Sequence, residues 1–124
     1  MIERRTYPRF KLKLDARYRI IDSEEAWKHA GARNISAEGL CFEAGEKLNA
    51  GTHVELEVDL KDDGPAVRIV GEIKWSSELE KPEGEEKAFL NGVRLINIPV
   101  SDESRFLKYY CDKMVEKLSC YLKI

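Results

Sequence analysis

Two short segments carry side chains suited to binding a phosphorylated purine. The first is Arg4-Arg5-Thr6-Tyr7-Pro8-Arg9, and the second, Asn34-Ile35-Ser36-Ala37-Glu38-Gly39, begins 25 residues after Arg9. Guanidinium groups match phosphate oxygens and purine edges bidentately, and they stack on flat rings. The second segment adds an amide, a hydroxyl and a glycine, at which the backbone can approach a ligand closely. We interpret the two segments as two halves of one binding site.

Positive charge is concentrated near the N-terminus. Residues 1–19 hold seven basic and two acidic side chains, a net charge of +5, whereas the whole chain has a net charge of −2. Residues 78–87 hold five acidic and two basic side chains. Proteins that bind nucleic-acid polymers are usually basic overall. A local basic segment on an acidic domain suits a small anion better, so no nucleic-acid polymer is expected as a partner.

Length and composition predict one globular domain over residues 1–124. The chain is 43% hydrophobic and 35% charged, which is typical of a folded protein. No apolar run approaches the roughly 20 residues of a membrane helix, and no signal peptide is evident, so no membrane insertion is expected. The three cysteines, Cys41, Cys111 and Cys120, form no CxxC pair. This pattern favours a reducing cytoplasm, with Cys111 and Cys120 in or near the core.

Alternating apolar and polar residues predict an all-β fold. Residues 11–20 show the pattern most clearly, and turn residues separate the later segments. Six short strands with almost no intervening helix predict a small antiparallel β-barrel over residues 11–97, because closure removes sheet edges. The expected strands are 11–20, 26–35, 40–44, 54–60, 66–77 and 88–96.

A C-terminal α-helix is expected over residues 101–122, with Ser101 as its N-cap. Its apolar stripe consists of Leu107, Cys111, Met114, Leu118 and Tyr121, and is widened by Phe106, Tyr110 and Val115. We expect this face to pack on the barrel. The 4-3-4-3 spacing leaves a second possibility open, a homodimer formed through the helix.

The paired motifs resemble the signature of PilZ domains, RxxxR followed by [D/N]xSxxG. Gly71-Glu72-Ile73-Lys74-Trp75 and Gly92-Val93-Arg94-Leu95 are also similar to the late strands of that family. The resemblance covers nearly the whole chain. It implies a six-stranded barrel with a C-terminal helix that binds the bacterial second messenger cyclic di-GMP. It also implies a flexible N-terminal arm, residues 1–10, that wraps over the bound ligand.

The resemblance assigns roles to six residues. Arg5 and Arg9 would clamp phosphate oxygens and guanine edges, and Asn34 and Ser36 would contact a guanine edge and nearby polar atoms. Gly39 would permit the close backbone approach. Many members have Asp where this chain has Asn34. Binding is expected to survive this difference, and whether the missing charge weakens it stays open. Arg4 precedes the motif at a place that sets ligand stoichiometry in some members, and an intercalated pair of ligands is slightly favoured.

These residues favour one function over several alternatives. The leading hypothesis is a receptor that binds cyclic di-GMP and signals to a separate downstream protein; the alternative is an interaction scaffold that binds no ligand. A single-stranded nucleic-acid binder is disfavoured by the net charge. No enzymatic activity, metal or cofactor is expected, because the sequence shows no nucleophile–base set or metal-ligand spacing.

Four further residues have two possible roles. Trp27 and Trp75 are expected to be packing residues, with Trp75 on the same face of its strand as Ile73. Arg33 and Arg94 fit an exposed strand position or the ligand site equally well.

Overall fold

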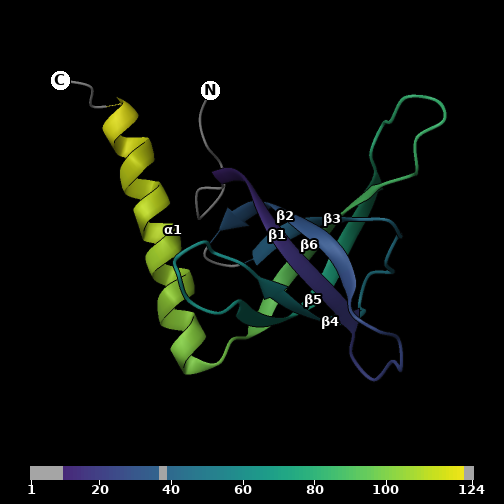
Figure 1. The fold of residues 1–124 in the computed structure, drawn as a ribbon, viewed down its shortest axis with the longest axis horizontal. Helices are drawn as coiled ribbons and strands as arrows, with labels where there is room; N and C mark the ends of the chain where they lie inside the picture. The colour runs from purple at the N-terminus through teal and green to yellow at the C-terminus, as the bar shows by residue number, and fades with distance from the viewer. Residues whose placement is uncertain (1–9, 37–38, 122–124) are drawn as a thin grey trace.

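The fold is a closed six-stranded barrel followed by one helix. The computed structural model describes residues 10–36 and 39–121. All strand pairs are antiparallel, as predicted. The strand order is β1-β2-β3-β6-β5-β4, with β4 returning to β1 (Figure 1). The elements are β1 (Phe10–Ile20), β2 (Lys28–Ser36), β3 (Gly39–Ala44), β4 (His53–Val58), β5 (Val67–Glu78), β6 (Phe89–Asn97) and α1 (Val100–Tyr121).

The barrel interior is filled by the inward-facing residues of every strand. Tyr18 and Phe42 lie at its centre, with ring centroids 5.1 Å apart, and both are fully buried. The Tyr18 hydroxyl donates a 2.6 Å hydrogen bond to Glu46 Oε1, which also accepts from Lys28 Nζ. Burial and the neighbouring carboxylate raise the pKa of Tyr18, so its hydroxyl stays protonated and keeps donating.

The outer face of β1, β4 and β5 is covered by ion pairs. Arg17 pairs with Glu57 and Arg19 with Glu55, directly across the β1–β4 register. The guanidinium carbons of both arginines lie within 4.8 Å of the Trp27 ring centroid. Trp27 is therefore a packing residue on the barrel surface, held by cation–π contacts.

The helix packs on the barrel through one part of the predicted apolar face. Phe106 and Tyr110 are buried and join the barrel core, whereas Leu107, at 41% exposure, and Cys111 are exposed. The core position expected for Cys111 is thus wrong, and Leu107 lies at the edge of the packed face. The side chains of Met114, Leu118, Cys120 and Tyr121 lie outside what the structure describes. Two aromatic side chains one turn apart bury more apolar area than leucine and cysteine would, and the helix is rotated accordingly.

Contacts at the start of α1 also differ from the prediction. The Pro99 carbonyl accepts hydrogen bonds from the Asp102 and Glu103 amides, so the first helical turn begins before Ser101. Ser101 is therefore not the N-cap. The Asp102 carboxylate instead accepts a 3.0 Å hydrogen bond from the backbone amide of Arg68 in β5. This contact joins the first turn of the helix to the barrel.

Replacement of Phe106 by Ala tests this packing. We expect a loss of about 3–5 kcal/mol in the free energy of unfolding, because a fully buried aromatic ring is removed. Chemical denaturation followed by circular dichroism measures the loss. Val115→Ala, on the exposed side of the same helix, serves as the control and should change stability by less than about 0.5 kcal/mol. Equal effects of the two substitutions would contradict the observed orientation of α1.

Candidate ligand-binding site

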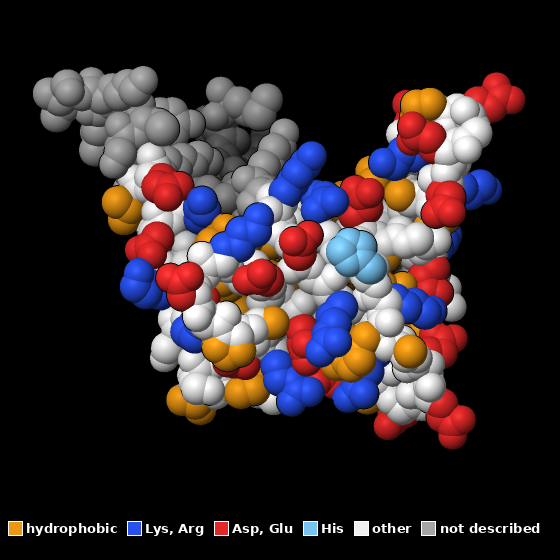
Figure 2. All heavy atoms as spheres, in the orientation of Figure 1, with side chains coloured by type: hydrophobic (Ala, Val, Ile, Leu, Met, Phe, Trp, Pro, Cys, Tyr) orange, Lys and Arg blue, Asp and Glu red, His pale blue; other side chains and the backbone are white. Residues whose placement is uncertain are grey.

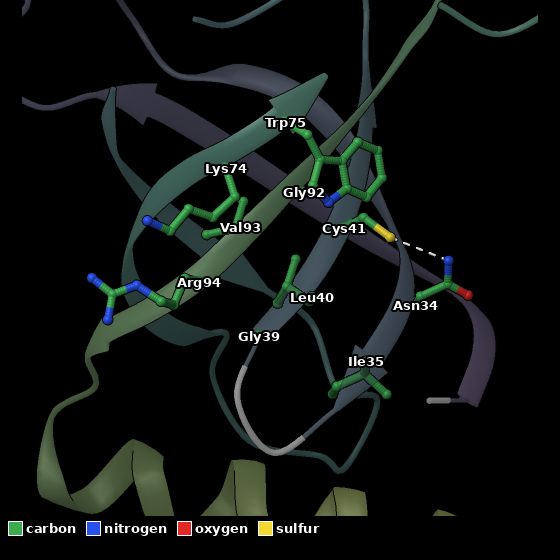
Figure 3. A pocket seen from close by; sticks show the side chains of 10 residues that line it. All are labelled: Asn34, Ile35, Gly39, Leu40, Cys41, Lys74, Trp75, Gly92, Val93 and Arg94. Carbon is green, nitrogen blue, oxygen red and sulfur yellow. Dashed lines mark hydrogen bonds between the residues drawn. The ribbon is translucent and has the colours of Figure 1, made fainter. Parts of the chain in front are cut away.

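A cavity of about 260 Å³ lies on the outer face of the barrel, over β2, β3, β5 and β6 (Figure 3). It combines an indole ring, two cationic side chains, an amide and a thiol on a floor of strand backbone. Its lining residues are Asn34, Ile35, Gly39, Leu40, Cys41, Lys74, Trp75, Gly92, Val93 and Arg94.

The strand register explains why these residues meet. Asn34 lies opposite Cys41, Cys41 opposite Gly92, and Gly92 opposite Trp75, which forms one row across four strands. Two positions further along the strands, Gly39 lies opposite Arg94. Because side chains alternate between the faces of a sheet, these two rows share the outer face.

The intervening row faces inward and closes the floor of the cavity from below. Ile35 pairs with Leu40, and Leu40 pairs with Val93, and all three side chains are buried. The cavity therefore lies on a packed apolar core, and a ligand in it contacts the outer surface of the barrel.

Trp75 reaches the outer face because of a β-bulge. Simple alternation from Val67, Ile69 and Ile73 predicts Trp75 inside the barrel, but its exposure is 41%. The β5–β6 register shifts by one residue between Ile73 and Trp75, with Lys74 as the extra residue. An extra residue reverses the facing of the later positions in a strand. The expectation that Trp75 packs on the same face as Ile73 is therefore wrong.

Two glycines allow backbone and ring to come close at the site. A Cβ atom on Gly92 would overlap the Trp75 indole, so glycine leaves the space into which the ring fits. A Cβ atom on Gly39 would overlap the carbonyl oxygen of Val93. Gly39 is thus needed for the close approach of β3 to β6, as the first residue of a strand.

The charges beside the cavity form a small cluster around one carboxylate. Glu72 Oε1 accepts a 3.2 Å hydrogen bond from Arg94, and Glu72 Oε2 accepts a 3.3 Å hydrogen bond from Lys74. Hydrogen bonds from Arg94 and then from Lys74 lower the pKa of Glu72. Two cations against one anion leave a net positive charge at this edge of the cavity. Arg33 does not line the cavity and pairs with Glu43.

Asn34 lies at the opposite side of the cavity from Arg94 and Lys74 (Figure 3). Its amide nitrogen donates a 3.1 Å hydrogen bond to the sulfur of Cys41, whose side chain is buried. The amide is therefore held on one side by a strand neighbour and is partly exposed on the other.

The predicted site residues divide into three groups. Asn34 and Gly39 line the cavity together. Ser36 ends β2 and pairs with Gly39, but its side chain lies outside what the structure describes. Arg4, Arg5 and Arg9 lie outside the described residues altogether.

Chain connectivity still relates the arginine motif to the cavity. β1 begins at Phe10, which pairs with Ile35, and the next residue, Lys11, pairs with Asn34. The arginine motif directly precedes Phe10 in the chain, so the end of β1 that follows this motif pairs with the segment that carries Asn34.

Several residues of the cavity carry little signal in the sequence. Alternation alone places the Trp75 side chain in the core, because it does not reveal the bulge. No local motif marks Cys41, and Lys74 belongs to a segment that resembles a late strand of the family without marking it as a site residue. A weak signal does exist: a glycine in a late strand, here Gly92, can mark a close approach of backbone or ring. Arg94 is an exposed residue of β6 that also lines the cavity.

Other kinds of site find no support within residues 10–36 and 39–121. In that part of the chain, no group of His, Cys, Asp and Glu side chains is arranged to hold a metal ion. Its single helix, α1, is not apolar enough over sufficient length to cross a membrane.

Known structures share this fold. The chain aligns with Bacillus subtilis inhibitor of motility (MotI/DgrA) at 21% identity and a TM-score of 0.69, covering 94% of this chain and 53% of that one. It aligns with the PilZ domain of YcgR from Escherichia coli, solved with c-di-GMP, at 15% identity and a TM-score of 0.68, covering 98% and 100%. K. pneumonia MrkH in complex with c-di-GMP aligns at 18% identity and a TM-score of 0.70, covering 94% and 54%.

The chain thus spans about half of MotI/DgrA and MrkH and all of the YcgR domain. Comparison with curated protein sequences gives no match. The family model for the PilZ domain matches residues 3–111, which include both sequence motifs and all six strands. This chain therefore belongs to the PilZ domain family.

Proposed function

We propose that this domain is a receptor for cyclic di-GMP. The observation that carries the proposal is the outer cavity, in which Asn34 and Gly39 of the second motif meet Trp75 and Arg94. Two similar structures, the YcgR domain and MrkH, contain c-di-GMP. The chemistry fits a guanine dinucleotide, because an indole stacks on a purine, an amide pairs with a guanine edge, and cations attract phosphate.

The size of the cavity supports a site formed by the cavity together with another part of the chain. Pockets that enclose a drug-sized ligand usually measure about 300–1,000 Å³. A cavity of about 260 Å³ therefore suits one base better than a whole cyclic dinucleotide. We propose that the 1–10 arm covers the remainder, with Arg5 and Arg9 on phosphate oxygens and guanine edges. Ordering of the arm on binding would create the surface that a separate downstream protein reads.

Charge on the visible surface favours a compact anion over a polymer. Basic and acidic side chains are interspersed over the face shown in Figure 2, with no continuous basic stripe across its described residues. Binding of a nucleic-acid polymer usually depends on such a stripe. Family membership and the free thiols of Cys41 and Cys111 support placing this receptor in the cytoplasm.

Removal of either motif arginine should abolish most of the binding. Arg5→Ala and Arg9→Ala each remove charge-assisted hydrogen bonds worth about 1.5–3 kcal/mol, so the dissociation constant should rise by about 10- to 150-fold. Titration calorimetry with cyclic di-GMP measures the change, and its stoichiometry tests the role of Arg4 in binding a ligand pair.

The control for this titration is Arg68→Ala. Arg68 is an exposed arginine on β5 that pairs with Glu55 and does not line the cavity. Its replacement should leave the affinity within about two-fold, since the effect of one distant surface charge is screened by salt. No heat with the unchanged protein at tens of micromolar ligand would overturn the proposed function and would leave the scaffold role as the better hypothesis.

Trp75 should report ligand binding directly. Stacking of a base on an aromatic side chain is worth about 1–3 kcal/mol, so Trp75→Ala should weaken binding by about 5- to 150-fold. Ligand should also change the tryptophan fluorescence of the unchanged protein. The change should persist in Trp27→Phe, since the Trp27 indole packs against Arg17 and Arg19, and disappear in Trp75→Phe. The reverse pattern would place the ligand elsewhere.

Glu72 should restrain binding of the anion. Glu72→Gln frees Arg94 and Lys74 from their shared counter-ion and should lower the dissociation constant by about three- to ten-fold at low salt, with less gain at high salt. Glu80→Gln, on the exposed β5–β6 loop, removes the same charge away from the cavity lining. An equal gain in both variants would show a general charge effect and no specific role for Glu72.

A further inference from the structure

We propose that Cys41 is a positioning residue for Asn34 and that this pair of residues determines how strongly the cavity prefers guanine over other bases. This inference rests on the proposed function, because it concerns how the cavity selects its base. The observation that carries it is the 3.1 Å hydrogen bond from Asn34 Nδ2 to Cys41 Sγ across the β2–β3 register.

The direction of this hydrogen bond, with the sulfur as acceptor, determines which atom of the amide is offered to a ligand. An asparagine side chain carries two donors on nitrogen and an acceptor on oxygen. With Nδ2 directed to the sulfur of Cys41, Oδ1 lies on the side of the amide away from Cys41 (Figure 3). An outward Oδ1 accepts from the N1–H and N2–H groups of guanine. Without a fixed partner the amide can also present Nδ2, which suits a base with an acceptor at this edge.

The surroundings of Cys41 allow it to serve this role. Its side chain is buried, at 5% exposure, and its cross-strand neighbours are Asn34 on β2 and Gly92 on β6. Gly92 has no side chain, and the Trp75 ring occupies the space that a Cβ atom at this position would need, so no side chain at position 92 competes for the sulfur. The thiol therefore lies in a fixed position between the ring and the amide (Figure 3).

The β-bulge in β2 makes the alignment possible. The β2–β3 register shifts between Ala32 and Asn34, with Arg33 as the extra residue. Beyond the shift, Asn34 is directly opposite Cys41, and side chains of opposed residues have Cβ atoms about 4.5–5.5 Å apart. That spacing brings a short thiol and an amide into hydrogen-bond contact.

Positioning by Cys41 matters more for an asparagine at position 34 than it would for an aspartate. A carboxylate presents two equivalent acceptor oxygens, so its rotation does not change what a guanine meets. An amide presents an acceptor in only one of its two orientations. Cys41 thus compensates for the amide at position 34 by holding it in the orientation that accepts.

The experiment compares Cys41→Val, which has a similar volume and no hydrogen-bonding group, with Cys41→Ser, which keeps one. Calorimetry measures dissociation constants for cyclic di-GMP and for cyclic di-inosine monophosphate, whose base lacks the N2 amino group. Cys41→Val should reduce the preference for guanine by about three- to ten-fold, the equivalent of one hydrogen bond, and Cys41→Ser should restore it. A structural role alone would weaken both ligands equally.

Two further variants complete the design. In an Asn34→Asp background, Cys41→Val should change the guanine preference by less than about two-fold, because a carboxylate needs no fixed orientation. Cys111→Ser controls for loss of a thiol, since Cys111 is exposed on α1 outside the cavity. If the unchanged protein binds cyclic di-GMP but Cys41→Val keeps its full guanine preference, the positioning role is wrong and the receptor function stands. If the unchanged protein binds neither ligand, both proposals fail.

Discussion

Closure of the six-stranded sheet is the constraint on which the rest of this molecule depends. β1 pairs with both β2 and β4, and β3 pairs with β6, so each of the six described strands has a partner on both sides. A small closed barrel has room inside only for its own side chains. Any ligand must therefore bind on the outside, where flat strand surfaces offer little shape. The bulges in β2 and β5 supply that shape, because each turns residues onto the outer face that regular alternation would place elsewhere.

Much of the fold could be predicted from the sequence, because period-two alternation is a direct consequence of half-buried strands. Six strands, their antiparallel barrel and the C-terminal helix follow from that pattern and from turn residues. The helix face could not be predicted in the same way. Leu107 and Cys111 belong to a regular apolar stripe, yet Phe106 and Tyr110 fill the barrel end. Which of two adjacent apolar faces is buried depends on the shape of the partner surface, and that shape is a property of the assembled barrel.

Only part of the candidate site could be predicted from the sequence. Asn34 and Gly39 carry a recognisable motif, and the structure brings them into one cavity. Trp75 and Cys41 join them only through cross-strand neighbours, which no local pattern reveals. A bulge of one residue leaves no mark in composition or hydropathy. The residues that sequence reasoning undervalues are thus those whose placement depends on register.

The bulge at Lys74 has a consequence for how such a site can change during evolution. Substitutions at Trp75 or Arg94 alter the cavity one side chain at a time and leave the interior untouched. Deletion of a single residue between Ile73 and Trp75 would exchange the two faces of every later position in β5. The Trp75 ring would then point into a filled interior. Ser76, which lies opposite the buried Asn91 in the present register, would turn outward. A change of chain length in this strand therefore rearranges both the cavity and the core, whereas substitution of one exposed cavity residue changes the cavity alone.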